Sequence, residues 1–147
     1  MENRKKDPAK KQLSAQTEIK VRFSEVDSMG IVWHGNYAKY FEDGRENFGK
    51  TYGIGYMDVH RHGYMIPLVK LNMDYKNQLK YEDEAILTTT FKNNPAAKIV
   101  FEYELRRKSD NKIIAIGQSI QVFLNKTYEL ELISPKFFEQ WKSKYIK

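Results

Sequence analysis

Residues 36–53, NYAKYFEDGRENFGKTYG, change the hydrophobic period of the chain and decide the fold. Their apolar and small positions recur at steps of three, one, three, four and four, as on one face of a helix of about four turns. We therefore predict a long helix over residues 36–52 that ends at a glycine. Two internal glycines each cost roughly 1 kcal/mol relative to alanine, so we expect another backbone to pack closely against the helix. The face consists of Tyr37, Tyr40, Phe41, Gly44, Phe48 and Tyr52.

On both sides of this helix the sequence alternates with a period of two, which indicates strands. One strand is predicted over residues 17–24, and four more over residues 69–75, 85–91, 99–105 and 114–124. The later strands follow one another through short turns, which favours antiparallel pairing. Residues 25–35 and 53–63 are predicted to be loops.

The C-terminal segment carries the signals of a short closing helix. Ser134 is the expected N-cap and Pro135 the expected first helical residue, with an aromatic stripe behind them. The predicted architecture is an α+β fold in which an antiparallel five-stranded sheet wraps a long central helix.

Length and composition bound the function. A chain of 147 residues corresponds to one domain, which we place at residues 17–147. The absence of cysteine excludes disulfides, thiolate metal sites and cysteine nucleophiles. The sequence has no long apolar run and no apolar core in its N-terminal segment, so we expect a soluble cytoplasmic protein without membrane insertion.

The net charge of +6 is confined to the two ends of the chain. Residues 1–16 carry five basic and two acidic side chains, residues 134–147 carry four and one, and the body is neutral. We predict that residues 1–16 form a disordered basic arm. Because a nucleic-acid-binding domain concentrates its positive charge on a folded face, this distribution argues against nucleic acid as a partner.

The loop before the long helix contains the candidate chemistry. Asp27 precedes the helix N-terminus, where free N–H groups can hold a developing oxyanion. A carboxylate and an oxyanion site together suffice for acyl transfer to water. The alternative is that Asp27 is a cap or turn residue.

Residues 27–37, DSMGIVWHGNY, resemble the signature of the 4-hydroxybenzoyl-CoA thioesterase branch of the hotdog-fold acyl-CoA thioesterases. Residues 40–45, YFEDGR, are similar to that family's helix start. The resemblance implies hydrolysis of an acyl-CoA without a cofactor, with Asp27 as the catalytic carboxylate. The backbone N–H near His34 would polarise the thioester carbonyl, and Gly30 and Gly35 would let backbone pass close to it. The residues that would form the acyl pocket are Met29, Tyr37, Tyr40 and Phe41.

Two alternatives remain within this family. A second branch uses a glutamate in the helix, a position that Glu42 matches, although Glu42 could instead pair with Arg45. The His34 side chain could orient substrate or water, or be an ordinary loop histidine. The resembled family builds its sites between two subunits, which implies a homodimer or homotetramer.

Two further clusters carry possible functions. Asp58, His60 and His62 alternate, which would suit a metal in a strand, but the flanking glycines favour a loop and no metal is predicted. Three cations end one strand and could meet the phosphates of coenzyme A, or form a solvated strand end. They are Arg106, Arg107 and Lys108.

Three functions therefore remain open. The first is an acyl-CoA thioesterase, and the second is a thioesterase for acyl-carrier-protein esters, which the basic tails could help to dock. The third is a non-hydrolytic acyl-binding module, because a fold does not determine a function.

Overall fold

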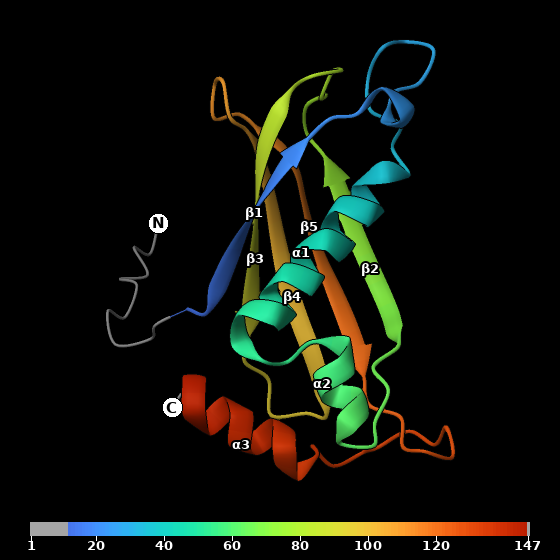
Figure 1. Ribbon diagram of the computed structural model, residues 1–147, viewed down its shortest axis with the longest axis vertical. Helices are drawn as coiled ribbons and strands as arrows, with labels where there is room; N and C mark the ends of the chain where they lie inside the picture. The colour runs from blue at the N-terminus through green and yellow to red at the C-terminus, as the bar shows by residue number, and fades with distance from the viewer. Residues whose placement is uncertain (1–11, 147) are drawn as a thin grey trace, which may run out of the picture.

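The computed structural model describes residues 12–146 and contains one antiparallel sheet with a long helix against it (Figure 1). The strands are β1 (Ser14–Lys20), β2 (Leu68–Tyr75), β3 (Glu84–Lys92), β4 (Lys98–Arg107) and β5 (Ile113–Val122). Their order in the sheet is β1-β3-β4-β5-β2, so β1 and β2 form the two edges. This arrangement confirms the predicted α+β architecture.

The helix α1 (Asn36–Tyr52) lies obliquely across one face of the sheet (Figure 1). It ends where the sequence predicted, because Gly53 adopts the left-handed conformation with φ 69°. Phe41 and Phe48 are fully buried beneath it against the inward side chains of β3 and β4. The helix α3 (Lys136–Tyr145) covers the end of the sheet near the C-terminus of α1, and Trp141 donates a hydrogen bond of 2.7 Å to the Tyr52 carbonyl.

Several predicted boundaries differ from the structure, among them the end of β5 (Ile113–Val122), which was predicted at residue 124. β1 begins at Ser14 and ends at Lys20, and residues 23–25 form a 3₁₀ turn rather than the end of the strand. Pro135 caps α3 and Lys136 is its first helical residue, one position later than predicted. Residues 53–63 are not a loop throughout, because α2 (Tyr56–Arg61) forms there with Val59 fully buried.

The early start of β1 corrects the proposed arm over residues 1–16. Ser14 and Ala15 pair with Thr90 and Thr89 of β3, and Ala15 is buried. The Tyr52 hydroxyl donates a hydrogen bond of 2.6 Å to the Ser14 carbonyl. Residues 14–16 therefore belong to the sheet, and the part of the predicted arm over residues 1–11 lies outside the described residues.

The close backbone approach predicted for the glycines of α1 is confirmed at Gly49, whereas Gly44 packs against side chains of β3. A Cβ on Gly44 would lie 2.4 Å from the Thr89 hydroxyl of β3. A Cβ on Gly49 would lie 2.6 Å from Cα of Gly55, in the turn that leads into α2. The second contact is between two backbones, so neither side can move away easily.

Gly49→Ala is expected to lower the free energy of unfolding although alanine is the better helix former. Overpacking costs about 1–3 kcal/mol, and the gain of about 1 kcal/mol in helix propensity offsets only part of it. Chemical denaturation of Gly49→Ala and of Lys50→Ala measures the difference. Lys50 is an exposed neighbour on the same helix, so its replacement should stay within about 0.5 kcal/mol of wild type. An unchanged or higher stability of Gly49→Ala would contradict the backbone contact.

Candidate active site

The loop that carries Asp27 is a tight hairpin at one end of the sheet. Val26 and Val32 form an antiparallel bridge, and the Asp27 N–H donates to the Ile31 carbonyl at 2.8 Å. The Gly30 N–H donates to the Asp27 carbonyl at 3.0 Å, as in a turn followed by a left-handed residue. Gly30 has φ 78°, which favours glycine, so its role in this structure is conformational.

The Asp27 carboxylate takes part in this turn without being fully occupied by it. Its Oδ1 accepts a hydrogen bond of 2.8 Å from the Met29 N–H, which is the turn interaction expected of an aspartate. Within residues 12–146, Oδ2 has no hydrogen-bond partner. The side chain is partly exposed, so Oδ2 can reach water or a ligand.

The N-terminus of α1 lies beside this hairpin and offers free donors. The carbonyl of Glu25 accepts hydrogen bonds from the Trp33 N–H at 2.9 Å and from the Asn36 side chain at 2.8 Å, which fixes the start of the helix against the loop. The backbone N–H groups of His34 and Gly35 have no acceptor in the part of the chain that the structure describes. They lie at the positive end of the helix dipole.

Two aromatic residues that the sequence analysis did not single out shape this helix start. The half-exposed Trp33 ring lies against Gly35. A Cβ on residue 35 would come within 2.1 Å of this ring. Gly35 therefore accommodates Trp33 rather than leaving open space. From β2, the Tyr75 hydroxyl donates a hydrogen bond of 3.2 Å to the His34 carbonyl. Trp33 stood within the quoted motif, whereas Tyr75 looked like an ordinary strand position.

The predicted acyl-pocket residues separate into two groups. The side chains of Tyr37, Tyr40 and Phe41 are buried within the protomer, and Phe41 stacks on Tyr103 with ring centroids 4.4 Å apart. These three side chains are thus part of the hydrophobic core, which leaves them little surface for a ligand in one protomer. Met29, in contrast, is 75% exposed on the hairpin.

Glu42 and Arg45 do not form the ion pair that their spacing allows. Within the described chain, Arg45 forms no ion pair, and its Nη1 instead donates a hydrogen bond of 3.1 Å to the Tyr103 hydroxyl. Glu42 lies exposed on α1, six residues or about 9 Å along the helix from Asn36. Glu42 and Arg45 both line a cavity of about 570 Å³ between α1 and α2.

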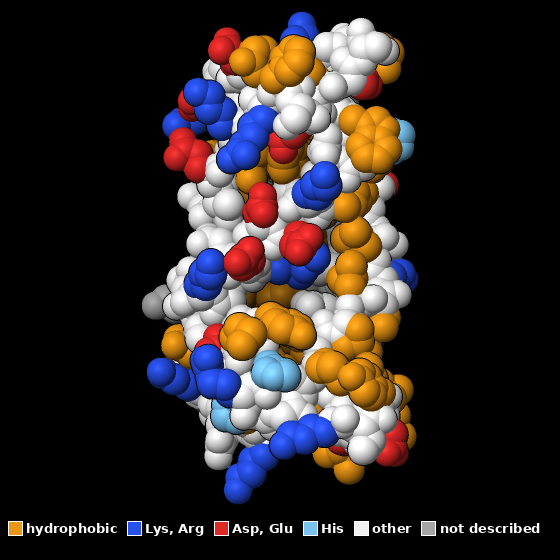
Figure 2. Space-filling model, turned by 45° about the vertical axis from the view of Figure 1, so that its right-hand side comes forward, with side chains coloured by type: hydrophobic (Ala, Val, Ile, Leu, Met, Phe, Trp, Pro, Cys, Tyr) orange, Lys and Arg blue, Asp and Glu red, His pale blue; other side chains and the backbone are white. Residues whose placement is uncertain are grey.

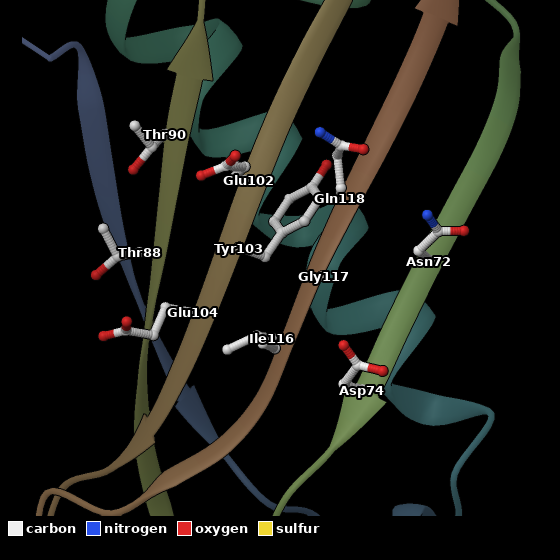
Figure 3. A pocket seen from close by; sticks show the side chains of 10 residues that line it. All are labelled: Asn72, Asp74, Thr88, Thr90, Glu102, Tyr103, Glu104, Ile116, Gly117 and Gln118. Carbon is white, nitrogen blue, oxygen red and sulfur yellow. The ribbon is translucent and has the colours of Figure 1, made fainter. Parts of the chain in front are cut away.

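Two other cavities lie elsewhere. One of about 530 Å³ covers the outer, polar face of the sheet, where side chains from β2, β3, β4 and β5 project together (Figure 3). A third, also of about 530 Å³, lies at the end of β1 beside Tyr81. Asp27 lines none of the three cavities, so one protomer surrounds this carboxylate only loosely.

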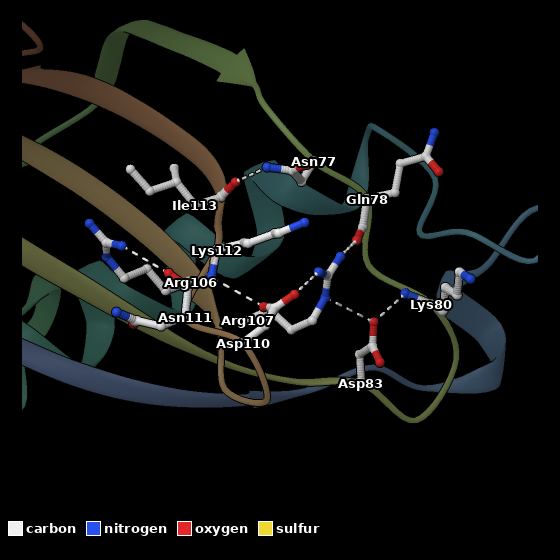
Figure 4. Close-up of polar contacts among 10 residues, drawn as sticks. All are labelled: Asn77, Gln78, Lys80, Asp83, Arg106, Arg107, Asp110, Asn111, Lys112 and Ile113. Carbon is white, nitrogen blue, oxygen red and sulfur yellow. Dashed lines mark hydrogen bonds and ion pairs between the residues drawn. The ribbon is translucent and has the colours of Figure 1, made fainter.

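The cations at the end of β4 have partners within the protein, and Figure 4 shows those of Arg107 and the hydrogen bond from Arg106 to the Asn111 carbonyl. Arg106 pairs with Glu104, and Arg107 pairs with Asp110 at 2.8 Å and with Asp83 at 3.6 Å. The Lys108 ammonium pairs with two carboxylates, at 2.7 Å and 3.5 Å. Because these acids offset the charge of Arg106, Arg107 and Lys108, the arrangement favours a solvated strand end, and their contact with the phosphates of coenzyme A stays a prediction.

Double replacement of Arg106 and Lys108 by methionine is therefore expected to change KM for an acyl-CoA by less than about threefold. Each side chain already satisfies its charge within the protein, and exposed pairs of this kind contribute little to stability. Steady-state kinetics at physiological ionic strength measures KM. A rise in KM of more than about tenfold, in a variant that still folds, would show that these cations bind the phosphates of coenzyme A.

The alternating acid and histidines of residues 58–62 lie on α2 and its end, not on a strand. Asp58 accepts the Gly55 N–H at 2.8 Å and pairs with Arg61. The His60 ring stacks with Tyr56, and the His62 ring stacks with Phe137. Each of the three side chains thus has its own partner, and residues 12–146 contain no group of three acids or histidines that could hold a metal ion.

No helix in the described range is long and apolar enough to cross a membrane.

Comparisons with known proteins agree with this architecture. Residues 21–140 match the model of the thioesterase-like superfamily. A Bacillus subtilis (strain 168) protein provisionally named acyl-CoA thioesterase YneP is 31% identical over 90% of this chain and 96% of its own length. The acyl-acyl carrier protein thioesterase ATL3 of Arabidopsis thaliana is 28% identical over 77% of this chain and 60% of its own.

Among solved structures, the DHNA-CoA thioesterase of Staphylococcus aureus superimposes with a TM-score of 0.79. It is 26% identical in sequence, and the match covers 89% of each chain. The family match over residues 21–140 agrees with the strand order and with the long helix across the sheet. The chain belongs to the thioesterase-like superfamily, has the hotdog fold and is a thioester hydrolase.

Proposed function

We propose that this hydrolase cleaves acyl-CoA esters with Asp27 as the catalytic carboxylate, as in the branch whose signature residues 27–37 resemble. The N–H groups of His34 and Gly35 would polarise the thioester carbonyl. One observation carries the proposal: the Glu25 carbonyl, two residues before Asp27, fixes the start of α1 against the loop that carries this carboxylate. In the described part of the chain, Oδ2 of Asp27 and the N–H groups of His34 and Gly35 have no hydrogen-bond partner.

The chemistry follows from these groups. A thioester carbonyl oxygen at the start of α1 accepts hydrogen bonds from the two N–H groups, which stabilise the negative charge that develops on it. Asp27 either removes a proton from water, whose oxygen attacks the carbonyl carbon, or attacks that carbon itself. The carbon–sulfur bond then breaks, and the CoA thiolate leaves and takes up a proton. In the second route, water hydrolyses the resulting anhydride.

Coenzyme A is favoured over a carrier protein as the acyl carrier. The basic C-terminal helix α3 lies at the opposite end of the sheet from the Asp27 hairpin (Figure 1), so it is poorly placed to dock a carrier at the site. One of its lysines, Lys142, is buried and paired with Glu139 at 3.0 Å. The relative ATL3, which is named for carrier-protein esters, keeps this alternative as the second candidate.

A thiol-release assay tests the function directly. Purified protein is offered a panel of acyl-CoA esters of different chain length and aromatic character, and the same acyl groups on acyl carrier protein. We expect release of free CoA from at least part of the first panel. Release from the carrier-protein panel alone would favour the second candidate, and binding without release from either would favour an acyl-binding module.

We further propose that the active unit is a homodimer or a larger homo-oligomer. Of the two edge strands, β1 presents polar side chains such as Glu18 and Lys20, whereas β2 exposes Leu68, Val69 and Tyr75. An exposed apolar edge strand is a template for pairing with another chain. A second subunit at β2 would also complete the surroundings of Asp27, which lines none of the three cavities described above.

A further inference from the structure

The cavity between α1 and α2 contains a basic group that the reaction proposed above does not use. Its apolar lining comes from Ile54, Ile66, Leu68, Ile99 and Phe101, and Tyr56 and Met57 are exposed. Gln121 and charged side chains of α1 and α2 complete the lining. Figure 2 shows the hollow on this side of the molecule, between the charged outer face of α1 and the apolar residues of α2. Arg45 lines the same cavity and is partly buried.

The Arg45 guanidinium is held in place but not neutralised. Its Nη1 donates to the Tyr103 hydroxyl, which also shares a hydrogen bond with Ser119. Burial raises the pKa of Tyr103, so this phenol stays neutral and contributes no opposing charge. Phe41 stacks on the Tyr103 ring and fixes its position.

The acidic side chains around the cavity do not neutralise the Arg45 guanidinium. Glu46 pairs with Lys50 at 3.1 Å, and Asp58 pairs with Arg61. Glu42 lies three residues before Arg45 but forms no ion pair with it in the part of the chain described. A guanidinium has five N–H donors in a planar fork, and Arg45 directs one of them to a protein acceptor. The remaining donors are available to a ligand in the cavity.

The cavity and the proposed oxyanion donors lie on the same side of α1, at different points along its length. His34, Ala38 and Arg45 stand at i, i+4 and i+11, which places them on one side of the helix. The neighbouring strand β2 runs beside this part of α1 (Figure 1), and its Tyr75 is hydrogen-bonded to the His34 carbonyl. Leu71 and Met73, half-buried on the same strand, give this side of the helix an apolar border.

The distance from the oxyanion donors to Arg45 sets the size of ligand that fits. Gly35 and Arg45 are ten residues apart, roughly 15 Å along the axis at 1.5 Å per residue. Helical side chains lean toward the helix N-terminus, so the guanidinium lies closer to the oxyanion donors than its Cα does. A thioester bound at the start of α1 would therefore reach Arg45 only with a medium or long acyl chain.

We propose that the cavity between α1 and α2 binds the far end of the acyl group, and that Arg45 selects acyl groups carrying an oxygen acceptor there. This inference rests on the proposed function, since it takes the ligand to be an acyl-CoA. An acyl chain with a terminal hydroxyl satisfies the free guanidinium donors, whereas an unsubstituted chain removes them from water without a partner. The polar end group thus determines specificity while the catalytic groups stay the same.

The test uses two non-hydrolysable thioethers of coenzyme A, dodecyl-CoA and 12-hydroxydodecyl-CoA, which differ by one oxygen. Isothermal titration calorimetry on the wild-type oligomer should show at least about tenfold tighter binding of the hydroxylated ligand, as expected for a hydrogen bond to a charged group. Arg45→Met should make the two affinities equal. The control Lys50→Met alters a rim cation already paired with Glu46 and should keep the preference.

Equal affinities in the wild type would overturn the inference, and this comparison needs no variant to fold. A preference that survives in Arg45→Met would overturn it as well. If the wild type shows no preference and Arg45→Met dissociates the oligomer in light scattering, Arg45 serves a subunit contact instead. Thioester hydrolysis is measured separately, so failure of the proposed reaction and failure of this specificity can be distinguished.

Discussion

Asp27→Asn is expected to lower the turnover of an acyl-CoA by at least about 100-fold, the scale of losing a general base or nucleophile. The substitution is informative because Asp27 has two roles that the structure separates. Its Oδ1 accepts the Met29 N–H in the hairpin, and its Oδ2 is free for chemistry. Asparagine can keep the turn interaction, since its amide oxygen accepts the same hydrogen bond. The loss should therefore fall on kcat, with KM and thermal stability close to wild type.

Glu42→Gln is the matched control for this prediction. Glu42 is the other carboxylate that the family resemblance offers, and it lies exposed on α1 at the cavity lined by Arg45. Turnover of this variant should remain within about threefold of wild type. Near-normal turnover of Asp27→Asn together with an inactive Glu42→Gln would mean that the helix glutamate carries the chemistry. Circular dichroism of both variants shows whether a lost activity comes from a lost fold.

The sequence predicted the elements whose pattern is local. The α1 boundaries followed from a change of period at residue 36 and from Gly53, which adopts positive φ. Strands β3 and β4 were recognisable because every second residue faces the core, as Leu87 and Leu105 do. The loop over residues 25–35 and the helix start beside it were also placed correctly, although the sequence did not predict that the loop forms a hairpin.

Elements that depend on distant partners were missed. Residues 14–16 show no apolar alternation, and they form a strand because β3 supplies the backbone partners. The helix α2 has only six residues, too short to be stable alone, and forms because Val59 is buried and Asp58 caps the Gly55 N–H. The cations at the end of β4 looked free in sequence, but their carboxylate partners include Glu18, which is distant along the chain.

A lysine in place of Val69 is expected to convert the protein to a monomer and to lower turnover by about 100-fold or more. Val69 is 59% exposed on the edge strand β2, next to the exposed Leu68. If β2 pairs with a second copy, an ammonium without a partner at this interface prevents association. Natural proteins use charged side chains on edge strands in the same way, to prevent unwanted pairing. Turnover should fall when the oligomer dissociates, because small displacements of groups around a reacting centre lower the rate by about 100-fold.

Asn72→Lys is the matched control, since it adds the same charge to the same strand. Asn72 lines the polar cavity on the outer face of the sheet, away from α1 (Figure 3), so this variant should keep both the oligomer and its turnover. Multi-angle light scattering at micromolar concentration and the thiol-release assay give the two readouts. A Val69→Lys monomer with wild-type turnover would show that one protomer holds a complete site. A wild-type protein that is monomeric and fully active would remove the subunit interface altogether, and Asp27 would then act on a substrate bound by its own hairpin and helix start alone.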